Sequence, residues 1–141
     1  MAPADRAGEM TRRIATCRCG GLTATCTGEP VRISVCHCLE CQKRSGSAFA
    51  VQARWPLDQV ELSGAFHEWV RVGESGRPAT FRFCPNCGAT VTFVSASMPD
   101  LTAVPVGAFA DPTFPAPRFS VFETRRHPWV HVAAEDMEHW D

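Results

Sequence analysis

Seven of the eight cysteines in this 141-residue chain fall into three tight groups. The groups are Cys17-x-Cys19, Cys36-x-Cys38-x-x-Cys41 and Cys84-x-x-Cys87. Closely spaced thiolates are typical zinc ligands. Zinc takes four protein ligands in a closed structural site, whereas a catalytic site has three and keeps the fourth position open. Two pairs and one group of three therefore predict two zinc ions per chain, one structural and one of the catalytic type.

Spacing alone leaves the grouping of these cysteines open. The first pair can share a metal with the last pair, or with Cys36 and Cys38, which would leave Cys41 with the last pair. We favour the first arrangement, because closing a long loop stabilises most in the chain-entropy model. It also leaves the middle group together in one short loop. We call the two sets the four-cysteine cluster (Cys17, Cys19, Cys84, Cys87) and the three-cysteine cluster (Cys36, Cys38, Cys41).

A different outcome is that both sites are structural, with His37, Cys26 or another residue completing the second. His37 lies between two predicted ligands. Its side chain is therefore expected to point away from the metal. Cys26 stands alone on an expected strand, where a buried free thiol is expected. The favoured hypothesis keeps the second site open to a substrate.

Longer segments surround the cysteines and extend toward the C-terminus. They are Cys17-Arg18-Cys19-Gly20-Gly21, Cys36-His37-Cys38-Leu39-Glu40-Cys41-Gln42-Lys43-Arg44-Ser45-Gly46, Ala48-Phe49, Phe83-Cys84-Pro85-Asn86-Cys87-Gly88, Val106-Gly107 and Pro128-Trp129. Together they resemble the glutathione-dependent formaldehyde-activating enzyme family, which includes centromere protein V-like proteins. Relatives often carry a histidine on the strand before the Pro-Trp pair, where this chain reads Arg118-Phe119-Ser120.

The resemblance implies a compact all-β fold of the β-tent kind. It implies a structural zinc in the four-cysteine cluster and a catalytic-type zinc in the three-cysteine cluster. Named members form S-(hydroxymethyl)glutathione from formaldehyde and glutathione, a carbon–sulfur lyase reaction. The expected substrates are thus a small thiol such as glutathione and a small aldehyde. The alternative hypothesis is a non-catalytic zinc-binding module that mediates protein interactions.

Adding a thiol to an aldehyde needs a thiolate and stabilisation of the carbonyl oxygen. Zinc with three thiolates carries a charge of −1, and a fourth thiolate makes it −2, so cationic side chains are expected nearby. The candidates are two adjacent pairs, Lys43 with Arg44 and Arg125 with Arg126. Aromatic side chains that could line a pocket, or else pack in the core, are Trp55, Trp69, Trp129 and Phe49. Gly46 and Ser47 could supply backbone donors.

Short alternating segments separated by turn signals predict an all-β domain. The expected strands cover residues 22–27, 31–36, 48–53, 60–62, 66–72, 79–83, 89–95, 101–106 and 119–122. Residues 38–45 predict a short helix or a loop, and Pro105 limits its strand to an edge or a bulge. We expect a flexible tail over 1–13, a zinc-binding domain over 14–132 and an acidic C-terminal tail, with a turn or short helix, over 133–141.

The formal net charge of −1 and the isoelectric point near 6.5 argue against a nucleic-acid partner. No stretch approaches the ~18 consecutive apolar residues of a membrane span, so no membrane partner is expected. Residues 1–13 have no apolar segment typical of a secretory signal. A cytoplasmic location is expected, where clustered cysteines are more often metal ligands than disulfides. A secreted domain stapled by disulfides is therefore disfavoured.

Overall fold

The computed structural model describes residues 11–73 and 76–141 of the chain. Of the tail expected over residues 1–13, residues 1–10 lie outside the described part of the chain. The described strands are β1 (Arg12–Thr16), β2 (Thr23–Thr27), β3 (Arg32–Cys36), β4 (Ala50–Pro56), β5 (Val60–Ser63), β6 (His67–Val72), β7 (Pro78–Phe83), β8 (Thr90–Ser95), β9 (Leu101–Pro105), β10 (Phe119–Val121) and β11 (Glu138–His139). The described helices are α1 (Leu39–Ser45) and 3₁₀ turns at Leu57–Gln59, Val106–Phe109 and Glu123–Arg125.

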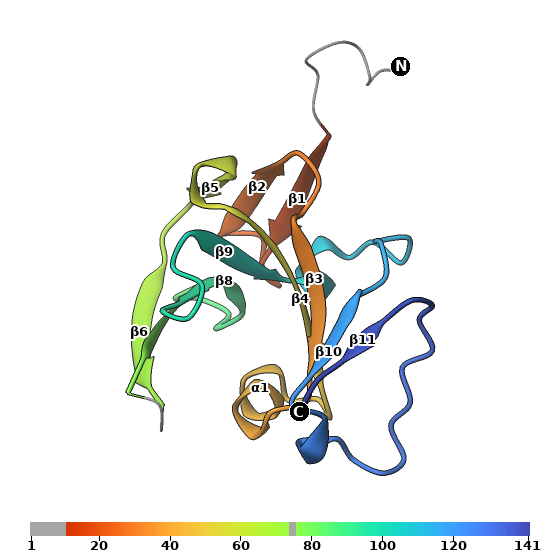
Figure 1. Cartoon of the computed structure of the whole chain (residues 1–141). Coiled ribbons are helices and arrows are strands. Elements are labelled where there is room, and N and C mark those ends of the chain that lie inside the picture. Colours follow the sequence, from red (N-terminus) through yellow and green to blue (C-terminus); the bar gives the residue numbers. More distant parts are fainter. Residues whose placement is uncertain (1–10, 74–75) are drawn as a thin grey trace.

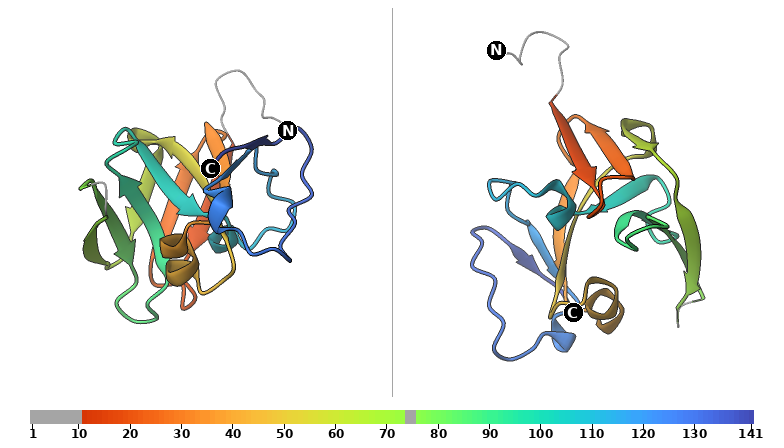
Figure 2. Two further views of the ribbon diagram at one scale, coloured as in Figure 1. Left: turned by 60° about the horizontal axis from the view of Figure 1, so that its bottom comes forward. Right: turned by 180° about the vertical axis from the view of Figure 1, so that it is seen from behind.

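These strands form two sheets, which confirms the all-β fold class. The small sheet has the order β1-β2-β5, and the large sheet has the order β11-β10-β3-β4-β9-β8-β7-β6. Neighbouring strands are antiparallel except at β10, which runs parallel to both β3 and β11. The small sheet lies at one end of β3 and β4, and α1 lies at the other end (Figures 1 and 2).

The core lies where the small sheet packs on the large one. Trp55 of β4 and Leu22, just before β2, are fully buried there, together with Val91 of β8 and Val104 of β9. Trp55 also donates its indole N–H to the carbonyl of Gly28 over 2.8 Å, so the polar atom of this large side chain is satisfied. Burial of both apolar faces therefore fixes the large sheet relative to the small one.

Most expected strands begin and end within two residues of the observed ones. Two elements differ from expectation: Arg12 and Arg13, expected in the flexible tail, belong to β1, and residues 138–139 form β11 rather than a turn or helix. The expectation that Pro105 confines its strand to an edge or a bulge is wrong, because β9 lies between β4 and β8. Pro105 is the last residue of that strand, where one missing donor N–H interrupts little of the ladder.

The described part of the chain contains no helix that is long and apolar enough to cross a membrane. Its one α-helix, α1, has seven residues and follows β3 directly. The helix matters because it carries one member of the three-cysteine cluster and ends at Gly46, whose φ of 69° is left-handed. The short helix therefore has a defined stop beside the cluster.

Candidate metal centres and the adjoining cavity

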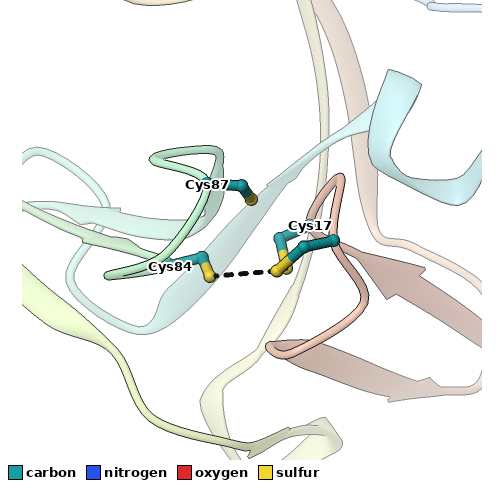
Figure 3. A group of neighbouring side chains, drawn as sticks. Cys17, Cys84 and Cys87 are labelled. Carbon is teal, nitrogen blue, oxygen red and sulfur yellow. Dashed lines mark hydrogen bonds between the residues drawn. The ribbon is translucent and has the colours of Figure 1, made fainter.

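The four-cysteine cluster joins the two sheets. Cys17 and Cys19 lie on the loop from β1 to β2, and Cys84 and Cys87 lie on the loop from β7 to β8. Figure 3 shows Cys84 and Cys87 reaching toward Cys17 across the gap between these loops. All four sulfur atoms lie within 4.8 Å of one another. The structure thus brings together the four residues that the favoured grouping assigns to one site.

The sulfur spacing in this cluster fits a tetrahedral metal ion. The Sγ atoms of Cys17 and Cys19 are 3.7 Å apart, and those of Cys19 and Cys84 are 3.6 Å apart. Zinc with bonds of about 2.3 Å to sulfur places its ligands about 3.8 Å from one another. The backbone N–H of Leu22 donates to Cys17 Sγ over 3.2 Å, as expected for a tight metal-binding turn. The residues present therefore fit a structural zinc ion.

The turns around the four-cysteine cluster favour the thiolate form of two of its members. Hydrogen bonds from the Asn86 side chain and the Gly21 backbone lower the pKa of Cys19. The backbone N–H groups of Ala89 and Cys19 lower the pKa of Cys87 to about 6. Thiolates are the form that binds metal, so these turns prepare the sulfur atoms of Cys19 and Cys87 for an ion, whereas the pKa of Cys84 is raised.

The three-cysteine cluster sits where β3 ends and α1 begins. Cys36 is the last residue of β3, Cys38 precedes α1 as its N-cap, and Cys41 lies in the first turn. Their sulfur atoms lie within 4.8 Å of one another. Hydrogen bonds from Cys36 and then Cys41 lower the pKa of Cys38, so the cluster favours at least one thiolate. Among the described residues, no His, Cys, Asp or Glu completes this group as a fourth ligand.

The two residues considered as a fourth ligand lie elsewhere. The His37 side chain is buried, and its Nε2 is 3.1 Å from Ser120 Oγ on β10. Cys26 is buried in the core between the sheets, where burial raises the pKa of its thiol to about 12. All eight cysteines are free of disulfide bonds. Neither of these two residues therefore serves as a ligand of the three-cysteine cluster.

A cavity of about 920 Å³ adjoins the three-cysteine cluster. Its wall includes all three of these cysteines, further residues of α1, and side chains of β3, β4, β8, β7 and β6 in the large sheet. Six lining side chains are cationic, namely Arg32, Lys43, Arg44, Arg54, Arg71 and Arg77, and two are acidic, Glu40 and Glu68. Glu40 pairs with Arg71 at 3.1 Å, and Glu68 pairs with Arg82 at 2.8 Å. The cavity therefore carries an excess of positive charge beside the thiols.

Sequence reasoning found part of this wall. Lys43 and Arg44, expected as cations near the metal, line the cavity. So does Trp69, which was expected either to line a pocket or to pack in the core. The remaining candidates do not line it: Arg125, Arg126, Trp55, Trp129, Phe49, Gly46 and Ser47. Trp55 belongs to the core, and Trp129 is 74% exposed. Arg126 instead donates from Nη1 to the carbonyl of Val130 over 2.6 Å.

The cations on the sheet were missed, although the sequence holds a signal for them. Arg32 and Ser34 alternate with buried Ile33 on β3 and so share the face of Cys36. On the paired strand, Gln52 lies opposite Ser34, and Arg54 lies opposite Arg32. The apolar positions of this strand predicted the core. Its polar positions, Arg32 and Ser34, lie on the same face as Cys36 and so indicate the cavity wall.

The sequence model of a known family, described as glutathione-dependent formaldehyde-activating enzyme, matches residues 12–125. The match spans most of the chain and includes both cysteine clusters. The chain belongs to this family. A crystal structure of a Rhodobacter sphaeroides protein, solved as a structural-genomics target, shares the fold with a TM-score of 0.54 and 23% sequence identity. That similarity covers 70% of this chain and 91% of the other. A search of curated proteins finds no significant match.

Membership of the glutathione-dependent formaldehyde-activating enzyme family agrees with the resemblance drawn from the sequence segments. The family match ends at residue 125, so it includes β3, α1 and the strands that line the cavity. The region after it holds β11, which pairs with β10 at the far edge of the large sheet. The cavity thus lies entirely within the part of the chain that the family model covers.

Proposed function

We propose that this protein is a zinc-dependent enzyme of the carbon–sulfur lyase type that acts on a thiol–aldehyde adduct. The proposed reaction resembles the formation of S-(hydroxymethyl)glutathione from glutathione and formaldehyde. One observation carries the proposal: three cysteines without a fourth protein ligand, among the residues described, open into a large cationic cavity. A purely structural metal site needs neither an open position nor such a cavity.

The proposed reaction is an addition that needs no oxidant or reductant. The thiol sulfur forms a bond to the aldehyde carbon, the carbonyl π bond breaks, and the thiol proton ends on the new hydroxyl oxygen. Cys36, Cys38 and Cys41, which line the cavity, would hold the zinc ion. Zinc bound there would supply a Lewis-acid position that favours the thiolate form of an incoming thiol.

The cationic side chains around the cluster support the same proposal. Arg44 of α1 and Arg54 of β4 line the cavity with Cys41. Three or four thiolates around one divalent ion leave a net negative charge, which nearby guanidinium groups offset. The same groups would orient carboxylates of an anionic thiol such as glutathione. The cavity volume lies in the usual range for a small-molecule site, about 300–1,000 Å³.

The test is an assay of adduct formation on protein of measured zinc content. We expect about two zinc ions per chain and faster transfer of ¹³C-formaldehyde into its glutathione adduct than in buffer, followed by NMR. Cys41→Ala should abolish the acceleration, and Cys26→Ala serves as the matched cysteine control. Transfer no faster than in buffer, across a panel of small thiols and aldehydes, would contradict the proposed function. A partner protein supplying the fourth ligand would instead support the non-catalytic binding module.

A further inference from the structure

An apolar strip runs along the part of the cavity wall that β8, β7 and β6 form. Strand pairing places Phe93 of β8 opposite Phe81 of β7, and Phe81 opposite Trp69 of β6. The rings of Phe93 and Phe81 stack with centroids 5.2 Å apart, and the ring of Trp69 lies 6.0 Å from that of Phe81. All three residues line the cavity, and we call them the aromatic strip. The strip therefore presents one continuous apolar surface to a molecule in the cavity.

The aromatic strip and the three-cysteine cluster share one region of the cavity wall. Cys41 and Arg44 are three residues apart on α1 and so lie on one face of the helix. The Arg44 guanidinium lies over the Phe93 ring, at 4.8 Å from its centroid. Arg44 therefore adjoins both the cluster and the near end of the strip, and a molecule held at the cluster extends toward these rings.

The cations of this region already have a role toward the cysteines. Arg54 interacts electrostatically with Cys41 and Cys36, and Arg44 interacts in the same way with Cys41. Charge balance at the cluster therefore accounts for these guanidinium groups, as in the proposed function. The aromatic strip has no such role, because its rings carry neither a charge nor a metal ligand.

The outer part of the strip is open to solvent, so packing in the core does not explain it. Trp69 is 57% exposed on β6, which is the edge strand of the large sheet, and Phe81 is half-buried. Exposed apolar side chains gathered on a concave surface are typical of ligand-binding sites. An apolar group of a bound molecule would remove these rings from water.

Phe122 adds a second apolar side chain to the wall, and its backbone is strained. It follows Val121, which pairs with Cys36 across β10 and β3, so Phe122 lies at the level of the three-cysteine cluster. Its φ of 55° is left-handed, its side chain is 50% exposed, and it lines the cavity. A bulky residue rarely adopts this conformation, and such strain is concentrated at ligand-binding and active sites. The fold does not bury this ring, so its position indicates contact with a bound molecule.

The chemistry of the two substrates indicates which of them carries the apolar group. Glutathione has no large apolar side chain, and formaldehyde has no substituent at its carbonyl carbon, so neither matches the aromatic strip. In the proposed function, the charged groups of the thiol are directed toward the cations around the cluster. A substituent on the carbonyl carbon is then the part of the adduct that faces the strip.

We propose that the aromatic strip and Phe122 bind an apolar substituent on the carbonyl carbon of the aldehyde, so that the preferred substrate is an aryl-substituted or long-chain aldehyde rather than formaldehyde. This inference rests on the proposed function in taking the three-cysteine cluster as the place where the aldehyde reacts. The step is a balanced addition: the thiol sulfur bonds to the carbonyl carbon, the carbonyl π bond breaks, and the thiol proton ends on the oxygen. Trp69, Phe81 and Phe122 act as binding residues that select the aldehyde.

The test uses two stable mimics of the adduct, S-(3-phenylpropyl)glutathione and S-propylglutathione, which differ only in the phenyl group. Binding of each compound to the zinc-loaded protein is measured by calorimetry. Because the glutathione part is the same in both, the ratio of the two affinities reports on the phenyl group alone. We expect the phenyl compound to bind at least about tenfold more tightly, since its ring leaves water on the strip.

Variants of exposed tryptophans assign this preference to the strip. Trp69→Ala should lower the ratio of affinities to below about threefold, and Trp69→Phe should keep most of it because an aromatic ring is retained. Trp140→Ala is the matched control, since Trp140 is also 57% exposed but does not line the cavity. This control should leave the ratio unchanged.

Phe122→Gly gives a result that a purely structural role would not produce. Glycine adopts the left-handed region freely, so the melting temperature should stay the same or rise while the ratio of affinities falls. A loss of stability with an unchanged ratio would overturn the assignment of Phe122 to the site.

The whole inference is overturned if neither compound binds, if the wild-type ratio is below about twofold, or if Trp69→Ala leaves the ratio unchanged. It is also overturned if the wild-type protein is a dimer that Trp69→Ala dissociates, because a second copy would then cover the strip. The two thioethers do not react, so their binding does not depend on catalysis. Failure of the proposed function would therefore appear in the adduct assay, and failure of this inference would appear in the ratio of affinities.

Discussion

At the scale of single residues, Cys41 and Cys26 allow the roles of cysteine to be separated. Cys41 lies in the first turn of α1 and contributes to a local cluster, so Cys41→Ala should leave the two sheets intact. We expect this variant to lose about one equivalent of zinc and any thiol–aldehyde activity, with little change in melting temperature. Metal analysis and thermal unfolding measure both effects.

Cys26→Ala should show the reverse pattern. Cys26 is fully buried in the core, so the variant should keep both zinc ions and lose about 1 kcal/mol of stability through lost apolar contact. If Cys41→Ala destabilises the protein as much as the loss of a four-cysteine ligand does, the division into structural and catalytic-type sites is incorrect.

The cysteine clusters and Arg44 of α1 could be predicted from sequence, but which arginines of the sheet join them at the cavity could not. Members of the three-cysteine cluster are at most five residues apart, so local chain geometry already brings them together. Arg54 and Phe93 are 39 residues apart and meet only because β9 lies between their strands. Strand order is a property of the whole sheet, and no local pattern specifies it. The polar alternation of β3 shows a face, and not which strands complete it.

At the scale of secondary-structure elements, the four-cysteine cluster is the link between the β1–β2 loop and the β7–β8 loop. Cys84→Ser should therefore unfold the domain or leave the sheets loosely packed, because zinc binding at such a site contributes folding free energy on the order of 10 kcal/mol. Cys84 is buried, so a serine there also leaves a polar group without its ligand. Circular dichroism and zinc content test this, with Cys41→Ala as the control. Unchanged melting and unchanged zinc content would contradict the assignment.

Gly64 ties the small sheet to the same metal-binding loop. Its φ of 108° is left-handed, and a Cβ there would collide with the carbonyl oxygen of Gly21, in the loop of Cys17 and Cys19. Gly64→Ala should therefore displace that loop and weaken zinc binding at the four-cysteine cluster. Gly46→Ala is the matched control, because its φ of 69° is also left-handed but a Cβ there meets nothing within 4 Å.

The control should lose only about 1–2 kcal/mol, the usual cost of a left-handed alanine. Gly64→Ala should lose more, and only this variant should release zinc at a lower chelator concentration. Equal losses of stability and equal zinc retention in the two variants would show that the approach of Gly64 to Gly21 is not a constraint on the loop.

The ends of a strand could be predicted where apolar and polar residues alternate over several positions. They were harder to predict where a segment is a strand only because it pairs with a neighbouring strand. β8 (Thr90–Ser95) shows clear alternation and was expected within one residue. β11 has two residues, both exposed, and it is a strand only because it pairs with Phe119 and Ser120 of β10. β1 begins with two arginines, and its pairing with β2 is likewise what makes it a strand. Such short edge strands depend on pairing with a neighbouring strand, which the local sequence does not identify.

At the scale of the whole molecule, the two candidate metal centres differ in how they are connected to the fold. The four-cysteine cluster lies between the sheets, whereas the three-cysteine cluster lies on one segment and faces the cavity. Under mild chelation, we expect about one zinc equivalent to leave first, with little loss of secondary structure. The second should leave only as the protein unfolds. Zinc release followed with a colorimetric chelator, alongside circular dichroism, gives both curves on one sample.

Thiol binding should change the ligands of the labile zinc and not those of the other. X-ray absorption without added thiol should report an average between three and four sulfur ligands per zinc, because only one of the two sites has a light-atom position. Addition of glutathione should move the average toward four sulfurs, since thiolate is the softer ligand. Cys41→Ala, which keeps the four-cysteine cluster, should show no such change.

Two results would argue against thiol activation: both zinc ions leave together under chelation, or added thiol does not alter the average number of sulfur ligands per zinc. The cationic cavity would then be better explained as a binding surface beside a structural metal.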